Sequence, residues 1–137
     1  MGLNRMYLRD ANIAIVCYDV TNKESLQKAE MWIQELKTNG PSEMLICICG
    51  NKMEETRRQV TLADGQAFAK RQQCTVFSEV SAKTKENLDS FFIRLGTEAY
   101  NRKATFTPVD RSQVKNVTAD GFGEFGGGKK KGGCSIF

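Results

Sequence analysis

Three short apolar runs alternate with stretches of helical period along the first hundred residues of the chain. The runs are "IAIVCYD" (13–19), "MLICICGN" (44–51) and "TVFSEVS" (75–81). Runs that are apolar at nearly every position are typical of strands covered on both faces of a sheet. The sequence therefore predicts three buried strands.

The first stretch of helical period lies between the first two apolar runs. Thr21 and Glu24 have the spacing of a capping box at its start, and Gly40 with Pro41 predicts its end. The apolar positions of this stretch fall on one helical face: Leu26, Ala29, Trp32, Ile33 and Leu36.

The second helical stretch, about 62–73, follows the second apolar run. Thr61 and Asp64 have capping-box spacing at its start, and the helix is expected to bury Ala67 and Phe68.

The third helical stretch, about 85–102, follows the last apolar run. Its apolar stripe comprises Leu88, Phe91, Phe92, Leu95 and Ala99. The order of elements is thus β-α-β-α-β-α. Since crossovers between parallel strands are right-handed, the fold class is predicted to be α/β, with a three-stranded parallel sheet and helices on its faces.

Composition divides the chain into two parts. Residues 1–103 carry the periodic pattern, whereas residues 104–137 are rich in Gly, have no sustained period and are expected to form a flexible tail. The formal charge of +4 gives no one-sided basic surface, so nucleic acid is not an expected partner. The absence of histidine excludes catalysis that uses imidazole as a base or ligand.

The cysteines indicate a reducing, cytosolic compartment. Their number is odd, and no two form a CxxC pair of the kind that holds zinc or performs redox chemistry. Four of them lie in or beside apolar runs and are interpreted as core residues: Cys17, Cys47, Cys49 and Cys74.

The loop "GNKMEE" after the second strand has side chains suited to a guanine base. The carboxylate of Glu54 could accept two parallel hydrogen bonds from a ring N–H and the neighbouring amino group, a donor pair that adenine lacks. The aliphatic part of Lys52 could lie along the flat face of the base. The Asn51 amide could bond a ring nitrogen and tie neighbouring loops together. The simpler interpretation is a polar, exposed turn.

The loop "SAKTKEN" follows the third strand, so both loops should open on the same edge of the sheet. Here the Ala82 N–H is expected to be free to meet the carbonyl oxygen of the base, and the Ser81 hydroxyl to brace the first loop. Lys83 completes the "SAK" triplet. Asp19, at the end of the first strand, is interpreted as a capping or loop-bracing residue rather than a metal ligand.

Residues 4–103 resemble small GTPases of the Ras superfamily, most closely the Rab branch. The family's Asn-Lys-x-Asp and Ser-Ala-Lys motifs match "NKME" (51–54) and "SAK" (81–83), and the flanking "MYLRDANIAIVCYDVTNKESL" and "FSEVSAKTKENLDSFF" are also similar. The resemblance implies part of the doubly wound, parallel P-loop GTPase fold. It also implies GTP or GDP as ligand, Mg²⁺ as cofactor, GTP hydrolysis and regulation of vesicle trafficking in the intact family.

By the same resemblance, six residues of the two loops are assigned to the guanine base: Asn51, Lys52, Glu54, Ser81, Ala82 and Lys83. Glu54 stands where the family has Asp, so its carboxylate is displaced by ~1.5 Å unless the loop adjusts. Glu55 is the alternative acceptor, with a shifted backbone.

The family's GxxxxGK[ST] phosphate loop and its switch regions are not found before residue 13. We therefore expect a sheet without its N-terminal half, an open edge at strand 13–19, and no catalytic residue or Mg²⁺ ligand in this chain. The resemblance gives no ground for hydrolysis or for binding of effectors by this chain alone.

The sequence "CSIF" (134–137) has the Cys-a-a-X form of a prenylation signal. The final Phe favours a geranylgeranyl chain on Cys134, and Lys129–Lys131 would add attraction to an anionic leaflet. The expected partners are prenyltransferase, escort factors and the cytosolic face of intracellular membranes. A second hypothesis is that the chain is a prenylated, membrane-tethered fragment that binds no nucleotide tightly.

Overall fold

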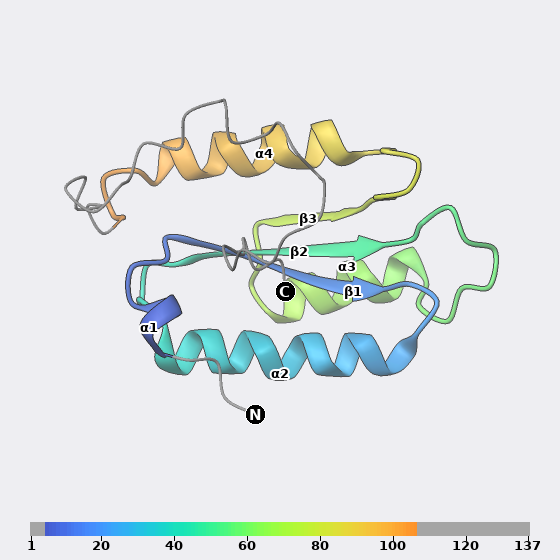
Figure 1. Cartoon of the computed structure of the whole chain (residues 1–137), viewed down its shortest axis with the longest axis horizontal. Helices are drawn as coiled ribbons and strands as arrows, with labels where there is room; N and C mark the ends of the chain where they lie inside the picture. The colour runs from blue at the N-terminus through green and yellow to red at the C-terminus, as the bar shows by residue number, and fades with distance from the viewer. Residues whose placement is uncertain (1–4, 107–137) are drawn as a thin grey trace, which may run out of the picture.

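The structure, a computed structural model, describes residues 5–106 and, within them, all side chains except those of Arg5 and Tyr7 (Figure 1). Strands and helices alternate along the chain, as the sequence predicts, after one additional helical turn at the start. The elements are α1 (Arg5–Leu8), β1 (Ile13–Asp19), α2 (Lys23–Asn39), β2 (Leu45–Asn51), α3 (Leu62–Arg71), β3 (Val76–Glu79) and α4 (Leu88–Asn101).

The three strands form one parallel sheet in the order β1-β2-β3. All seven residues of β1 pair with β2, so that Ile13 lies opposite Leu45 and Asp19 opposite Asn51. Within the described residues, no strand pairs with the outer edge of β1. The predicted α/β class is confirmed.

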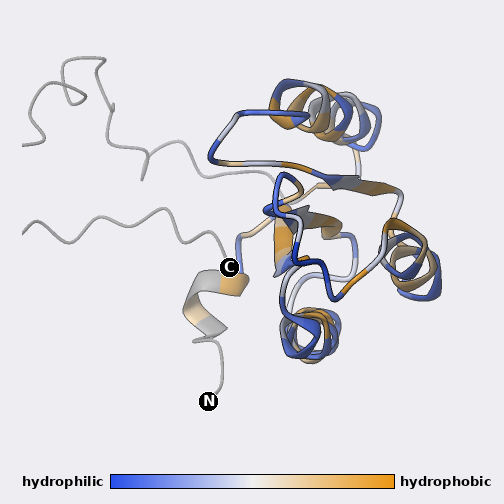
Figure 2. Cartoon of the chain, turned by 90° about the vertical axis from the view of Figure 1, so that its right-hand side faces the viewer, coloured by the Kyte–Doolittle hydropathy of each residue, from blue (hydrophilic) through white to orange (hydrophobic). Residues whose placement is uncertain are grey.

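Helices α2 and α3 cover one face of the sheet (Figure 2). Alternate residues of each strand point to opposite faces, and on this face β1 contributes Val16 and Tyr18, each 2% exposed. Ile48 at the centre of β2 has no exposed surface. The helices contribute the following buried residues: Ala29, Ile33, Leu36, Phe68 and Ala69.

Helix α4 covers the other face, mainly above β3 and β2 (Figure 1). Phe91 and Leu95 of this helix are buried against the sheet. The residues of β1 on this face are only half-buried: Ile13, Ile15 and Cys17. At Val16 and Tyr18 the strand is therefore covered more completely on the α2/α3 face than on the α4 face.

The start of α2 differs from the prediction, whereas its end agrees. The N-cap is Asn22 rather than Thr21, because the Asn22 side chain accepts hydrogen bonds from the backbone N–H groups of Glu24 and Ser25 at 2.9 and 3.3 Å. The Thr21 hydroxyl instead donates to Asp19. At the other end, the Gly40 N–H donates to the Leu36 carbonyl at 2.8 Å.

The predicted capping box of α3 is confirmed, since Thr61 and Asp64 bond each other's backbone N–H groups. The predicted burial of Ala67 is wrong. The buried residues of α3 are Gly65, Phe68 and Ala69, because residues three and four apart lie on the same face of a helix. Ala67 lies on the exposed side.

Helix α4 begins at Leu88, three residues later than predicted, because Asn87 is in the left-handed conformation with φ of 60°. The predicted burial of Phe92 is also wrong, since this side chain is 53% exposed. Phe91 and Leu95, four residues apart, define the face that meets the narrow sheet, and Phe92 lies to the side of it. None of the helices in residues 5–106 is long and apolar enough to cross a membrane.

Candidate functional site

The loops that follow the three strands meet at the carboxyl edge of the sheet, at the right-hand end of the strand arrows in Figure 1. Backbone hydrogen bonds join them directly. The Val20 N–H donates to the Asn51 carbonyl at 3.1 Å, and the Met53 N–H donates to the Val80 carbonyl, also at 3.1 Å. Three segments far apart in sequence thus form one polar surface.

The Asn51 side chain connects the loop that contains "NKME" to the loop that contains "SAK". Its side-chain oxygen accepts hydrogen bonds from the backbone N–H of Ala82 at 3.0 Å and from that of Lys52 at 2.8 Å. The predicted tie between the loops is therefore confirmed. The expectation that the Ala82 N–H is free is wrong, because Asn51 occupies it.

Lys52 lies in the left-handed region with φ of 65°, and its ammonium group forms an ion pair with Asp19. Partial burial raises the pKa of Asp19, but hydrogen bonds from Lys52 and from Thr21 outweigh burial, and the pKa is lowered. The same hydrogen bond from Lys52 to Asp19 raises the pKa of Lys52. Asp19 also accepts from the Thr21 N–H at 2.8 Å, so its predicted loop-bracing role is confirmed.

Glu54 lies in the first loop and interacts with the second. A hydrogen bond from the Ser81 hydroxyl and, to a smaller extent, one from the backbone of Glu54 itself hold the pKa of Glu54 below its usual range. The positive charges of Lys83 and Lys52 lower this pKa further. The Glu54 Oε2 atom is inaccessible to solvent and has no hydrogen-bond partner in the described part of the chain. After a side-chain rotation that exposes it, this oxygen could accept a hydrogen bond from an N–H donor of a ligand.

Ser81 is fully buried and braces its own loop by accepting the Thr84 N–H at 2.9 Å. The side chains of Lys83 and Lys52 are exposed beside Glu54. The structure thus brings together all six residues that the sequence assigns to the site, with Asn51 and Ser81 as its internal supports.

Two interactions that stabilise this edge were not predicted from the sequence: the Asn87–Glu79 hydrogen bond and the Arg58–Glu79 ion pair. Asn87 donates from Nδ2 to the Glu79 carbonyl at 3.0 Å, and its left-handed backbone is one that Asn tolerates better than most residues. Glu79 is buried and forms an ion pair with Arg58, which comes from the loop after β2. The available signal was a charged residue inside an apolar strand, since a buried charge requires a partner.

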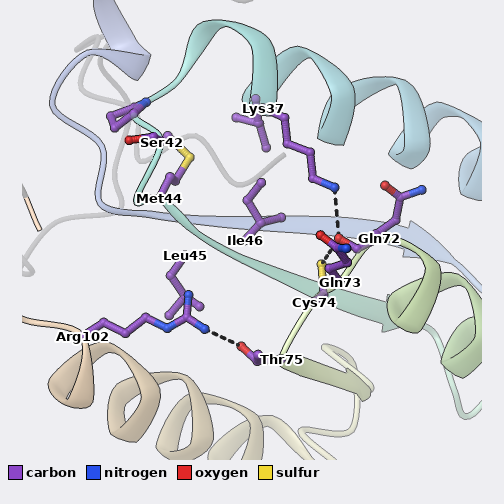
Figure 3. Close-up of a pocket in the computed structure, with 12 residues that line it drawn as sticks. Lys37, Ser42, Met44, Leu45, Ile46, Gln72, Gln73, Cys74, Thr75 and Arg102 are labelled. Carbon is purple, nitrogen blue, oxygen red and sulfur yellow. Dashed lines mark hydrogen bonds between the residues drawn. The ribbon is translucent and has the colours of Figure 1, made fainter. Parts of the chain in front are cut away.

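A separate cavity of about 250 Å³ lies at the opposite edge of the sheet, near the starts of β2 and β3 (Figure 3). Its two cationic residues already have partners. Lys37 donates to the Gln72 carbonyl at 3.0 Å, and Arg102 donates to the Glu98 carboxylate at 2.7 Å. The cavity therefore offers no free charge to a ligand.

Residues 5–106 contain no group of three or more His, Cys, Asp or Glu side chains able to hold a metal ion. Cys134 and Lys129–Lys131 lie outside the described residues, as does the expected tail from residue 107 onward.

Comparison with known proteins agrees with this geometry. The model of the Ras family matches residues 1–101, which include all six residues of the site. The chain belongs to the Ras family. As a member of this family it has the parallel α/β sheet expected of part of a P-loop GTPase, and the resemblance seen in its two loop motifs is confirmed.

Two curated relatives place the chain in the Rab branch. It is 45% identical over 93 residues to the GTP-binding protein ypt5 of Schizosaccharomyces pombe, an alignment that covers 66% of this chain and 44% of that protein. It is 31% identical over 131 residues to the Ras-related protein Rab-5A of Dictyostelium discoideum, covering 95% of this chain and 62% of that protein. The chain thus spans about half the length of these relatives.

Proposed function

We propose that the loops at the carboxyl edge of the sheet bind the guanine base of GTP or GDP. The observation that carries this proposal is the hydrogen bond between the Asn51 side chain and the Ala82 backbone, which joins the two loops across thirty-one residues. Ligands of open parallel α/β sheets bind at this edge. Membership of the Ras family and the name of the ypt5 relative, a GTP-binding protein, support the same ligand.

Each residue has a chemical role in the proposed site. Glu54 accepts the ring N–H and the amino group of guanine, for which its unpartnered oxygen is available after a side-chain rotation. The Asn51 amide nitrogen donates to a ring nitrogen, while Lys52 lies along the base. The Ala82 N–H, which donates to the Asn51 side chain in this structure, donates to the carbonyl oxygen of the base when the base is bound. Lys83 adds positive charge beside Glu54.

The use of Glu rather than Asp limits selectivity. A longer side chain moves the carboxylate by ~1.5 Å, which is comparable to the tolerance of a hydrogen bond. A site that bonds a polar edge discriminates strongly only when its geometry is met. We therefore expect guanine to be preferred over adenine, but by less than in a site with Asp.

The test is calorimetric titration of the purified chain with GDP and, separately, with ADP, each with and without Mg²⁺. GDP binding at a concentration where ADP does not bind supports the proposal. No binding at millimolar GDP would support the second hypothesis, a membrane-tethered fragment without tight nucleotide binding.

Variants at two neighbouring glutamates sharpen this test. Glu54→Asp should tighten GDP binding, and Glu54→Gln should weaken it, because the amide presents one acceptor where guanine needs two. Glu55→Gln is the matched control and should leave binding unchanged. If Glu55→Gln weakens binding instead, the acceptor is Glu55 with a shifted backbone.

We further propose that the whole protein acts as a Rab-type GTPase, with GTP hydrolysis, Mg²⁺ and switch-dependent effectors supplied by a complete domain of this family. Its place would be the cytosolic face of intracellular membranes, through geranylgeranylation of Cys134. The sequence "CSIF" with the preceding lysines supports this assignment. Radiolabelled geranylgeranyl diphosphate with a prenyltransferase should label the chain but not Cys134→Ser.

A further inference from the structure

Cys17 and Cys49 lie directly opposite each other on neighbouring parallel strands, β1 and β2. Both side chains point to the face covered by α4. Adjacent strands are about 4.8 Å apart, and a disulfide requires its Cα atoms to be about 4.4–6.8 Å apart. The backbone therefore places these two thiols within bonding reach without a change of fold.

The two cysteines differ in accessibility. Cys17 is half-buried, on the part of the face that α4 leaves partly open, whereas Cys49 is 5% exposed. The thiols interact with each other, and this interaction lowers the pKa of Cys17, against the opposing effect of burial. The same interaction, followed by burial, raises the pKa of Cys49. Cys17 is thus the thiol that ionises first and that a small molecule reaches first.

We propose that Cys17 and Cys49 are a redox-active pair that forms a reversible disulfide on reaction with a hydroperoxide. The Cys17 thiolate attacks the peroxide, breaks its O–O bond and becomes a sulfenic acid, while the leaving oxygen departs as hydroxide, or as alkoxide from an organic peroxide. The Cys49 thiol then displaces water from the Cys17 sulfur and forms the S–S bond. Two thiols lose two electrons in total, and the peroxide gains them.

The neighbouring Cys47 does not compete for this bond. It lies opposite Ile15 in the sheet, two residues along β2 from Cys49, so its Cα is too far from that of Cys17 for a disulfide. The side chains of Cys17 and Cys49 point in the same direction from two parallel strands. A disulfide between them is therefore more strained than one between converging side chains, and strained disulfides are more easily reduced. The proposed pair is therefore reversible, and it is independent of the proposed nucleotide site.

The experiment treats the full folded chain with limiting hydrogen peroxide, blocks remaining thiols with an alkylating agent and analyses tryptic peptides by mass spectrometry. Residue 17 lies in peptide 10–23, and residues 47 and 49 share peptide 38–52. We expect these two peptides to be joined, with a mass lower by two hydrogen atoms, and separated again by dithiothreitol. The joined form should exceed any other cysteine pairing by more than about tenfold.

Three serine variants assign the bond to atoms. Cys47→Ser, the matched control from the same strand and face, should retain the joined peptides, whereas Cys17→Ser and Cys49→Ser should lose them. Cys49→Ser should also accumulate a Cys17 sulfenic acid that dimedone traps.

The proposal is overturned if the peptides stay joined in Cys49→Ser, or if no joined form appears in the unmodified sequence at any peroxide dose. Should a variant fail to fold, the unmodified sequence decides the question alone. Its pairing in native buffer must then differ from the mixture of pairings formed in urea, and equal mixtures would refute the inference.

Discussion

The two faces of the sheet are covered to different extents, and β1 shows the difference within one strand. On the face beneath α2 and α3, Val16 and Tyr18 are each 2% exposed. On the face beneath α4, the alternate residues Ile13, Ile15 and Cys17 are half-buried. Neighbouring residues of one apolar run thus have very different surroundings.

The difference shows what an apolar run can and cannot specify. The run 13–19 predicts a strand covered on both faces, but a single helix, α4, is available for the second face and lies mainly over β3 and β2. The free energy of burial is roughly proportional to the area removed from water. We therefore expect the α2/α3 face to contribute most of the stability of residues 5–106.

The largest predicted effect compares one isoleucine from each face. Ile48→Ala, on the α2/α3 face, should lower the free energy of unfolding by about 2–5 kcal/mol, because Ile48 is completely buried and its removal leaves a cavity. Ile15→Ala, on the α4 face, should cost about half as much or less, since its side chain is already partly in water. Urea unfolding monitored by circular dichroism measures both. Equal losses would contradict the comparison and indicate that something covers the α4 face of β1.

A glycine pair, one in α3 and one on the exposed side of α4, gives the next largest effect, with opposite signs for the two positions. A Cβ atom at Gly65 of α3 would lie 2.3 Å from the Tyr18 hydroxyl and 2.9 Å from the Phe77 ring, so Gly65→Ala should destabilise the chain by about 1–3 kcal/mol. A Cβ at Gly96 of α4 meets nothing within 4 Å.

Gly96→Ala is therefore the matched control. It should stabilise the chain by up to about 1 kcal/mol, because Ala has the higher helix propensity. The melting temperatures of the two variants should move in opposite directions. If Gly65→Ala is also stabilising, then α3 does not approach the sheet as closely as its contacts indicate.

The same glycine explains why the sequence predicted the elements better than their details. Gly65 has low helix propensity, and only the close approach of α3 to Tyr18 explains its presence in the helix. Periodicity found every strand and the three long helices. It also identified the side of each helix that meets the sheet, since Phe68, Phe91 and Leu95 are buried as predicted. It could not define the width of that contact, because Ala67 and Phe92 are apolar but lie beside the contact rather than in it.

The candidate site shows a similar limit. The order of motifs along the chain predicted that the Asn51 and Ala82 loops share one edge, since parallel strands end together. It could not predict that the Ala82 N–H is already occupied, or that Arg58 pairs with Glu79, because both contacts depend on the loop conformations. Contacts that depend on strand order were predictable, and those that depend on turn geometry were not.

A smaller effect concerns the carboxyl end of β1, which polar contacts rather than a covering helix hold in place. Asp19→Asn removes the charge that pairs with Lys52 and should lower the free energy of unfolding at neutral pH by about 1 kcal/mol or less. Because the pKa of Asp19 is lowered in the folded state, its contribution is present above the unfolded value of about 3.9 and disappears as pH falls through the folded value.

The difference between the original chain and Asp19→Asn should therefore be constant above about pH 5 and shrink towards pH 2. Urea unfolding at each pH measures it. A difference that grows on acidification would show that the Asp19 carboxyl is destabilising in the fold.

The smallest predicted effect tests whether the well-covered face is also fully satisfied in its hydrogen bonds. Tyr18 is buried beneath α3, and its hydroxyl has no hydrogen-bond partner among residues 5–106. Tyr18→Phe keeps the ring and removes the unpaired hydroxyl, so stability should stay the same or rise by up to about 0.5 kcal/mol. Tyr100→Phe, at a side chain that is 67% exposed, is the control and should change nothing measurable. If Tyr18→Phe instead lowers the free energy of unfolding by more than about 1 kcal/mol, a buried water is the hydrogen-bond partner of the hydroxyl. The α2/α3 face then contains internal water despite the low exposure of its side chains.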